Sequence, residues 1–112
     1  MCLFCEIAKK NIPSTCVYED ENVFVFNDIA PKAETHMLVI PKEHIASMAE
    51  VTAENSALVA HCFEVIAKIC KEKGIADDGF RVISNCGEKA GQTVFHLHFH
   101  VLAGNGMTEA HV

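Results

Sequence analysis

Three histidines alternate with apolar residues near the end of the chain, at His96, His98 and His100. Successive side chains of a β-strand point to opposite faces, so these imidazoles should share one face at steps of about 6.7 Å. The apolar residues between them would then face a core. Such a row suits two chemistries. One is metal binding by neutral imidazoles, and the other is phosphoryl or nucleotidyl transfer with one histidine as the nucleophile.

A polar loop, Asn85–Thr93, leads directly into the histidine row and contains two glycines together with amide and hydroxyl side chains. Backbone N–H groups in such a loop can surround an anion. Most glycine-bearing loops are simple turns, so the loop alone is a weak signal. Its position before the histidines favours the phosphate chemistry.

A second candidate site is the Cys-x-x-Cys pair Cys2 and Cys5. On a short helix or turn the two sulfurs fall on one side, which is half of a tetrahedral zinc site that histidines would complete. A thioredoxin-like redox motif would need a strand before it, whereas this pair opens the chain. The alternative interpretation is two reduced thiols in a chain that has six cysteines.

The sequence pattern around these residues predicts an α+β fold. It would consist of an antiparallel sheet, one long helix and a short N-terminal helix. Apolar residues at three-and-four spacing indicate the long helix over Thr52–Lys73, with Cys62 and Cys70 in its buried face. Thr52 should cap this helix, Glu54 should lie in its first turn, and Gly74 should end it. The short helix is expected over Leu3–Lys10, and the strands over Cys16–Tyr18, Val23–Phe26, Thr35–Ile40, Phe80–Ser84 and Val94–Leu102.

Length and composition limit the classes of protein that fit. The 112 residues make one expected domain, 1–112, and half of them are hydrophobic. The formal net charge of −6 argues against a broad nucleic-acid surface. No apolar run reaches the roughly 18 residues of a membrane span, and the N-terminus lacks the pattern of a secretory signal. We therefore expect a cytoplasmic protein with no membrane partner.

The histidine row and its flanks resemble the histidine triad (HIT) family, in particular its nucleotide-binding, Hint-type branch. The resemblance implies a homodimer of α+β subunits whose sheets join into one. It also implies hydrolysis of purine nucleoside phosphoramidates and related adenylylated compounds. The matching segments are Phe26–Pro31, Thr35–Ile45, Gly91–Phe95 and His96–Leu102.

Residue roles follow from this resemblance position by position. His98 matches the nucleophile that forms a nucleotidyl-histidine, and His100 matches a residue that contacts phosphate oxygens. Asp28 matches the acid that accepts hydrogen bonds from the ribose, and His36 matches a histidine near the leaving group. The remaining matches are phosphate contacts from Asn85, Thr93 and the backbone near Gly91 and Gln92, and a base slot of Leu3, Phe4, Ile7, Phe26 and Ile29.

The resemblance also completes the second site, because many microbial members bind zinc with the cysteine pair, His44 and His96. The tail Gly104–Val112 departs from animal members, since it lacks their tryptophan. Two alternatives to a hydrolase with a covalent histidine intermediate remain. One is a non-catalytic module that binds purine nucleotides, and the other is a metal hydrolase that uses all three row histidines as ligands. The metal hydrolase ranks low because it gives Asp28 and the loop no role.

Overall fold

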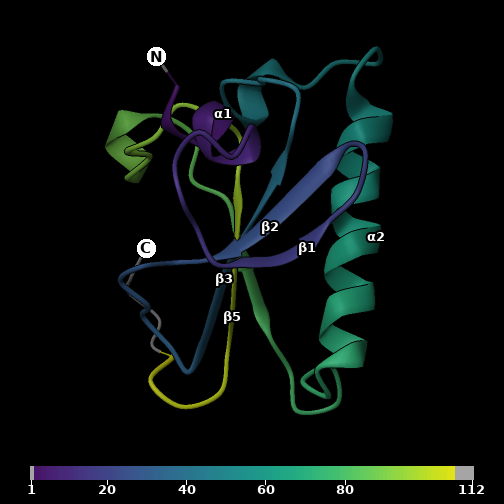
Figure 1. Ribbon diagram of the computed structural model, residues 1–112, viewed down its shortest axis with the longest axis vertical. Helices are drawn as coiled ribbons and strands as arrows, with labels where there is room; N and C mark the ends of the chain where they lie inside the picture. The colour runs from purple at the N-terminus through teal and green to yellow at the C-terminus, as the bar shows by residue number, and fades with distance from the viewer. Residues whose placement is uncertain (1, 108–112) are drawn as a thin grey trace.

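The computed structural model describes residues 2–107, which form an antiparallel five-stranded sheet, two α-helices and two short 3-10 helices, an α+β fold as predicted (Figure 1). The strand order is β1-β2-β3-β5-β4. The tail is described only as far as residue 107. The α-helices are α1 (Leu3–Ala8) and α2 (Ser56–Glu72), and the strands are β1 (Cys16–Glu19), β2 (Val23–Asn27), β3 (Thr35–Pro41), β4 (Arg81–Ile83) and β5 (Phe99–Ala103).

Alternation along the central strands divides the interior into two cores, one on each face of the sheet. The odd-numbered residues of β2, β3 and β5 pack against α2, where Cys62 and Cys70 are fully buried as expected. The even-numbered residues of β2 and β3 pack against Phe4 and Ile7 of α1. His100 is the even-numbered residue of β5 beside Leu38, so the sheet turns the histidines toward the α1 face.

The last strand is shorter than predicted, because β5 begins at Phe99 and not at Val94. The β3–β5 register would place Pro41 opposite Leu97, and a proline has no N–H to donate to the ladder. The Leu97 N–H instead donates to the Ile45 carbonyl at 2.6 Å. The segment before β5 nevertheless keeps its alternation, since Leu97 joins the α2 core while His96 and His98 face the other way.

The long helix begins four residues later than predicted, at Ser56, with Asn55 as its N-cap residue. Residues 52–55 form a separate turn, in which the Asn55 side chain accepts the Thr52 N–H at 2.8 Å and Thr52 accepts the Glu54 N–H at 3.2 Å. Thr52 therefore caps this turn, and Glu54 lies before the helix. The predicted end is confirmed, because Gly74 follows the C-cap with a φ of +75°.

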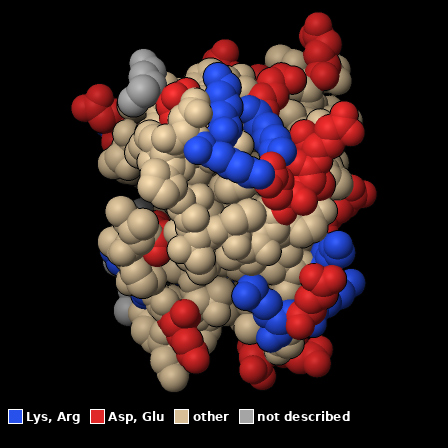
Figure 2. All heavy atoms as spheres, in the orientation of Figure 1, with Lys and Arg blue, Asp and Glu red and all other residues tan. Residues whose placement is uncertain are grey.

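Acidic and basic side chains lie next to each other on the face shown in Figure 2 and do not form one continuous basic surface. Ion pairs connect segments that are separate in the sequence, since Glu19 pairs with Lys10 at 2.8 Å and with Lys42 at 2.7 Å. Among residues 2–107, no helix is long and apolar enough to span a membrane.

Candidate active site and metal centre

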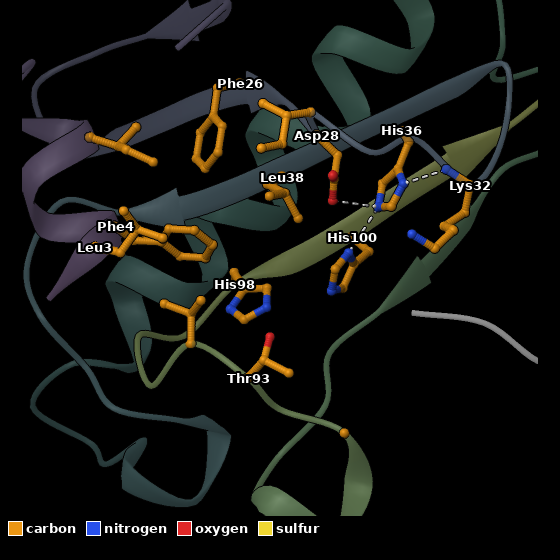
Figure 3. Close-up of a pocket in the computed structure, with 14 residues that line it drawn as sticks. Leu3, Phe4, Phe26, Asp28, Lys32, His36, Leu38, Thr93, His98 and His100 are labelled. Atoms are coloured by element: carbon orange, nitrogen blue, oxygen red, sulfur yellow. Dashed lines mark hydrogen bonds and ion pairs between the residues drawn. The ribbon is translucent and has the colours of Figure 1, made fainter. Parts of the chain in front are cut away.

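A cavity of about 480 Å³ lies between α1, the ends of β2 and β3, and the segment that leads into β5 (Figure 3). One end is apolar, where the Phe4 and Phe26 rings meet edge to face at 5.5 Å. The other end carries charged and polar groups. The apolar lining residues are Leu3, Phe4, Ile7, Phe26, Ile29, Leu38 and Val94, and the others are Asp28, Lys32, His36, Gly91, Thr93, His98 and His100.

Eleven of the residues given a role from the sequence line this cavity, and they include Leu3 and His36. Ile29 stands at the rim with its side chain 98% exposed, so the slot itself is formed by the other apolar residues. Asn85 and Gln92 do not line the cavity. Lys32, Leu38 and Val94 also line the cavity, although no pattern in the sequence assigned them to it; the strand register places Leu38, and the segment before β5 places Val94.

His98 presents an unprotonated ring nitrogen to the cavity. Its Nδ1 lies 2.7 Å from the His96 carbonyl oxygen, and because a carbonyl only accepts, Nδ1 carries the proton. Nε2 therefore holds the lone pair. Burial lowers the pKa of His98, although the bond to the His96 carbonyl and the charge of Asp28 oppose this shift. A neutral imidazole with a fixed tautomer is suited to nucleophilic attack.

The His98 backbone is itself held in place, since Ser84 donates its hydroxyl to the His98 carbonyl at 2.9 Å. The ring stands edge-on to Phe4, with 5.0 Å between the ring centroids. The nucleophile candidate is therefore held by Ser84, which directly follows β4, and by Phe4 of α1. The sequence gives no signal for Ser84, because its partner is a backbone atom that only the fold brings near.

A relay of hydrogen bonds fixes the tautomer of His100. The Lys32 backbone N–H donates to His36 Nδ1 at 3.0 Å, so the His36 proton lies on Nε2. His36 Nε2 lies 2.9 Å from His100 Nδ1 and donates to it. His100 must then carry its own proton on Nε2. It thus offers an N–H donor beside His98, with 5.0 Å between the two ring centroids, which suits a phosphate oxygen.

Asp28 lies between the apolar end and the histidines (Figure 3). Its Oδ1 accepts the Ala30 N–H at 2.8 Å, and its Oδ2 is 3.5 Å from His36 Nε2. The Asp28 N–H donates to the His36 carbonyl at 3.0 Å, so the end of β3 positions the acid. A partly exposed carboxylate at this point can accept hydrogen bonds from a sugar.

The glycine-bearing loop is braced internally. Gln92 is 3% exposed, and its side chain accepts the Gly87 N–H at 2.8 Å and donates to the Ala46 and Val94 carbonyls. The Gln92 N–H donates to the Gly87 carbonyl, and the Gly91 N–H donates to Glu88. Gln92 therefore holds the loop in shape, whereas Gly91 and Thr93 reach the cavity.

The second site brings together Cys2, Cys5, His44 and His96, as predicted, with the four ligand atoms within 4.8 Å of one another. His96 Nδ1 lies 3.3 Å from the Cys2 sulfur, 3.4 Å from the Cys5 sulfur and 3.3 Å from His44 Nδ1. Bonds of about 2.3 Å to sulfur and 2.05 Å to nitrogen give tetrahedral edges of about 3.4–3.8 Å. The spacing therefore suits an ion of this kind.

The protonation pattern also suits a metal ion. His96 Nε2 lies 2.7 Å from the Pro41 carbonyl and donates to it, so the Nδ1 lone pair faces the cysteines. Burial and the neighbouring Cys2 raise the pKa of the Cys5 thiol to about 11. A cation favours the thiolate form, so metal binding there would release protons.

Asp28, His36 and His100 form another close group, with their ligand atoms within 4.8 Å. The tautomers argue against a metal ion in it. A metal on His36 Nε2 would require the proton on Nδ1, where it would face the Lys32 N–H donor. These three residues are therefore better described as linked by hydrogen bonds than as metal ligands.

The fold agrees with the comparisons. Residues 1–111 match the family described as "Scavenger mRNA decapping enzyme C-term binding". A histidine triad protein from Clostridium difficile superposes with a TM-score of 0.92 at 49% identity, covering 98% of this chain and 96% of that one. A HIT family hydrolase from Legionella pneumophila reaches a TM-score of 0.92 at 42% identity, with 96% of each chain covered. The chain belongs to the histidine triad (HIT) family.

Among its relatives is the purine nucleoside phosphoramidase of Escherichia coli K12. The two sequences are 42% identical over 102 residues, which are 91% of this chain and 86% of the relative.

Proposed function

We propose that this protein hydrolyses purine nucleoside phosphoramidates or related nucleotidyl compounds through a covalent intermediate on His98. The observation that carries the proposal is the fixed tautomer of His98, whose Nε2 lone pair faces the cavity while Nδ1 is held 2.7 Å from a carbonyl. The similarity to the Escherichia coli phosphoramidase supports the same class of substrate. The purine would lie in the apolar end, beside Phe4 and Phe26, with the ribose at Asp28.

In the first step, His98 Nε2 attacks the α-phosphorus and the phosphorus–nitrogen bond to the leaving amine breaks. The amine takes a proton from solvent and departs. His100 donates its Nε2–H to a phosphate oxygen, and Thr93 supplies a hydroxyl. In the second step, water attacks the phosphorus, the bond to His98 breaks, and one proton returns to solvent with the free nucleotide.

The matching experiment is a steady-state assay of purified protein on a panel of nucleoside 5′-phosphoramidates. His98→Ala should lose several orders of magnitude in kcat and still bind AMP, because most binding contacts lie elsewhere. A variant that retains activity within about tenfold would refute the assignment. Failure of the parent protein to cleave any member of the panel, with AMP bound, would favour the non-catalytic nucleotide-binding module.

We also propose that the Cys2–Cys5–His44–His96 site holds one structural zinc ion. Two thiolates and two imidazoles fill a tetrahedral ion and leave no position for water. Because His96 lies two residues before His98, the ion would connect α1 to the catalytic segment without contacting the phosphorus. Elemental analysis of protein purified without a metal-affinity tag should find close to one zinc per chain.

We further propose a homodimer formed through α2 and β4. β4 is at the edge of the sheet, and apolar side chains are exposed on both elements, Phe63 at 48% and Val82 at 37%. Sedimentation at micromolar concentration should show a species of twice the 12.3 kDa chain mass. A monomer alone would contradict this.

A further inference from the structure

Of the described residues that line the cavity, Lys32 is the only lysine or arginine, and Asp28 is the only acid. The proposed mechanism uses the backbone N–H of Lys32 and leaves its ammonium group without a role. The side chain is exposed, and its Nζ donates to the Ala30 carbonyl at 3.0 Å. Its charge is therefore near the reaction centre but not part of it.

No carboxylate among residues 2–107 forms an ion pair with Lys32. Glu34 is the nearest acid in the sequence, and its carboxylate instead accepts the Asn105 N–H at 3.1 Å. Since a carbonyl oxygen only weakly offsets an ammonium charge, Lys32 offers a positive charge to an anionic group here, even though Asp28 lines the same cavity and the chain is acidic.

Lys32 lies at the opposite end of the histidine group from the nucleophile candidate His98. The contacts run in order from His98 to His100, from His100 to His36 and from His36 to the Lys32 backbone. Figure 3 shows the same order, with Lys32 beyond His100 as seen from His98. In phosphoryl transfer the attacking and leaving atoms lie roughly in line. With the phosphorus beside His98 and His100, an in-line leaving group would depart on the side away from His98, which is the side of Lys32 (Figure 3).

We propose that Lys32 is a specificity residue that recognises a carboxylate on the leaving amine. This proposal rests on the proposed function and narrows it. The preferred substrates are nucleoside 5′-phosphoramidates whose amine is an amino acid or a similar carboxylate-bearing compound. A single ammonium group matches one negative charge, whereas a polyphosphate leaving group would place two or more charges against it.

The test compares two adenosine 5′-phosphoramidates, one N-linked to glycine and one N-linked to glycinamide, which differ in a single charge. The measured quantity is the ratio of kcat/KM for glycine to that for glycinamide. Lys32→Gln should lower this ratio about fivefold, which is the size of an exposed charge pair near 1 kcal/mol. Lys32→Glu should lower it further, because it places a like charge opposite the carboxylate.

The matched control is Lys71→Gln, which removes the same charge from the exposed end of α2. It should leave the ratio unchanged, and raising the ionic strength should reduce the ratio of the parent protein but not that of Lys32→Gln. A ratio that changes less than twofold in Lys32→Gln, or equally in the Lys71 variant, would overturn the proposal while leaving the hydrolase intact. If the parent protein cleaves neither compound nor any simpler phosphoramidate, the proposed function itself fails.

Discussion

Substitution of His36 tests whether it controls the tautomer of His100. An amide can replace either imidazole nitrogen, since asparagine places its terminal group near Nδ1 and glutamine places it near Nε2. His36→Gln should keep a donor toward His100 Nδ1, 2.9 Å away in the parent protein. His36→Asn should keep the contact with the Lys32 N–H and lose the one with His100.

The size of the effect follows from burial. His36 is 3% exposed and His100 is 8% exposed, so their hydrogen bond is shielded from water and solvent does not readily replace it. Such a loss costs about 1–3 kcal/mol, which is about 5- to 150-fold in rate. Because the bond directs the His100 proton toward the phosphate, the loss should fall on kcat more than on the affinity for AMP.

Single-turnover kinetics with adenosine 5′-phosphoramidate separates chemistry from product release, and calorimetry with AMP measures binding. We expect His36→Gln within about tenfold of the parent protein and His36→Asn slower by a further factor of about 10. Thermal unfolding of both variants serves as the control for a purely structural effect. Equal rates for two equally stable variants would refute the relay.

Three other predictions concern separate groups. Asp28→Ala should weaken AMP binding by about 1–3 kcal/mol and weaken a 2′,3′-dideoxy analogue much less; equal losses in calorimetry would mean that the acid serves the fold. Cys5→Ser should abolish zinc binding, and it should affect the melting temperature more than turnover. If added zinc does not change the melting temperature of metal-free protein, the two cysteines are free thiols. His61 bonds to Asp20 at 2.7 Å, which raises the pKa of His61, while the pKa of Asp20 is lowered to about 2. A raised pKa stabilises the fold below the histidine's ordinary pKa, and this effect is lost as pH rises through the raised value. The advantage of the parent over His61→Asn, below about 1 kcal/mol for this exposed pair, should therefore be larger at about pH 5.5 than at pH 8.5 in urea unfolding, and a reversed order would contradict the ion pair.

The sequence predicted the buried faces correctly in those segments where the hydrophobic pattern extends over many residues. The alternation around Phe99 and the spacing of the α2 core residues indicated which faces are buried, and the structure confirms both. The boundaries were less accurate, because they depend on individual hydrogen bonds that hydrophobic periodicity does not report. Pro41 removes a ladder donor opposite Leu97, which is far away in the sequence, and the Asn55 side chain accepts the N–H of Thr52 only three residues earlier.

For the candidate sites, the sequence predicted which residues come together but not how they are protonated or hydrogen-bonded. The regular spacing of the histidine row and the cysteine pair identified residues that the structure brings together. The tautomers of His98 and His100 could not be predicted, because the His96 carbonyl and the Lys32 N–H set them. Gln92 carries an amide that could bind phosphate, but in the structure this amide accepts the Gly87 N–H within the same loop. Lys32, four residues before His36, is a charged residue of the cavity that the sequence patterns did not indicate.

The central claim is that His98 becomes covalently nucleotidylated, and a rapid-quench experiment tests it directly. Protein mixed with a slow adenosine 5′-phosphoramidate should be stopped within the first turnover, kept alkaline to protect a phosphoramidate bond, digested and analysed by mass spectrometry. We expect an adenylyl group on the peptide that contains residues 96–100, located at His98 by fragmentation and absent in His98→Ala. A parent protein that releases AMP with no adenylylated peptide at any time, or with the label on another residue, would contradict it.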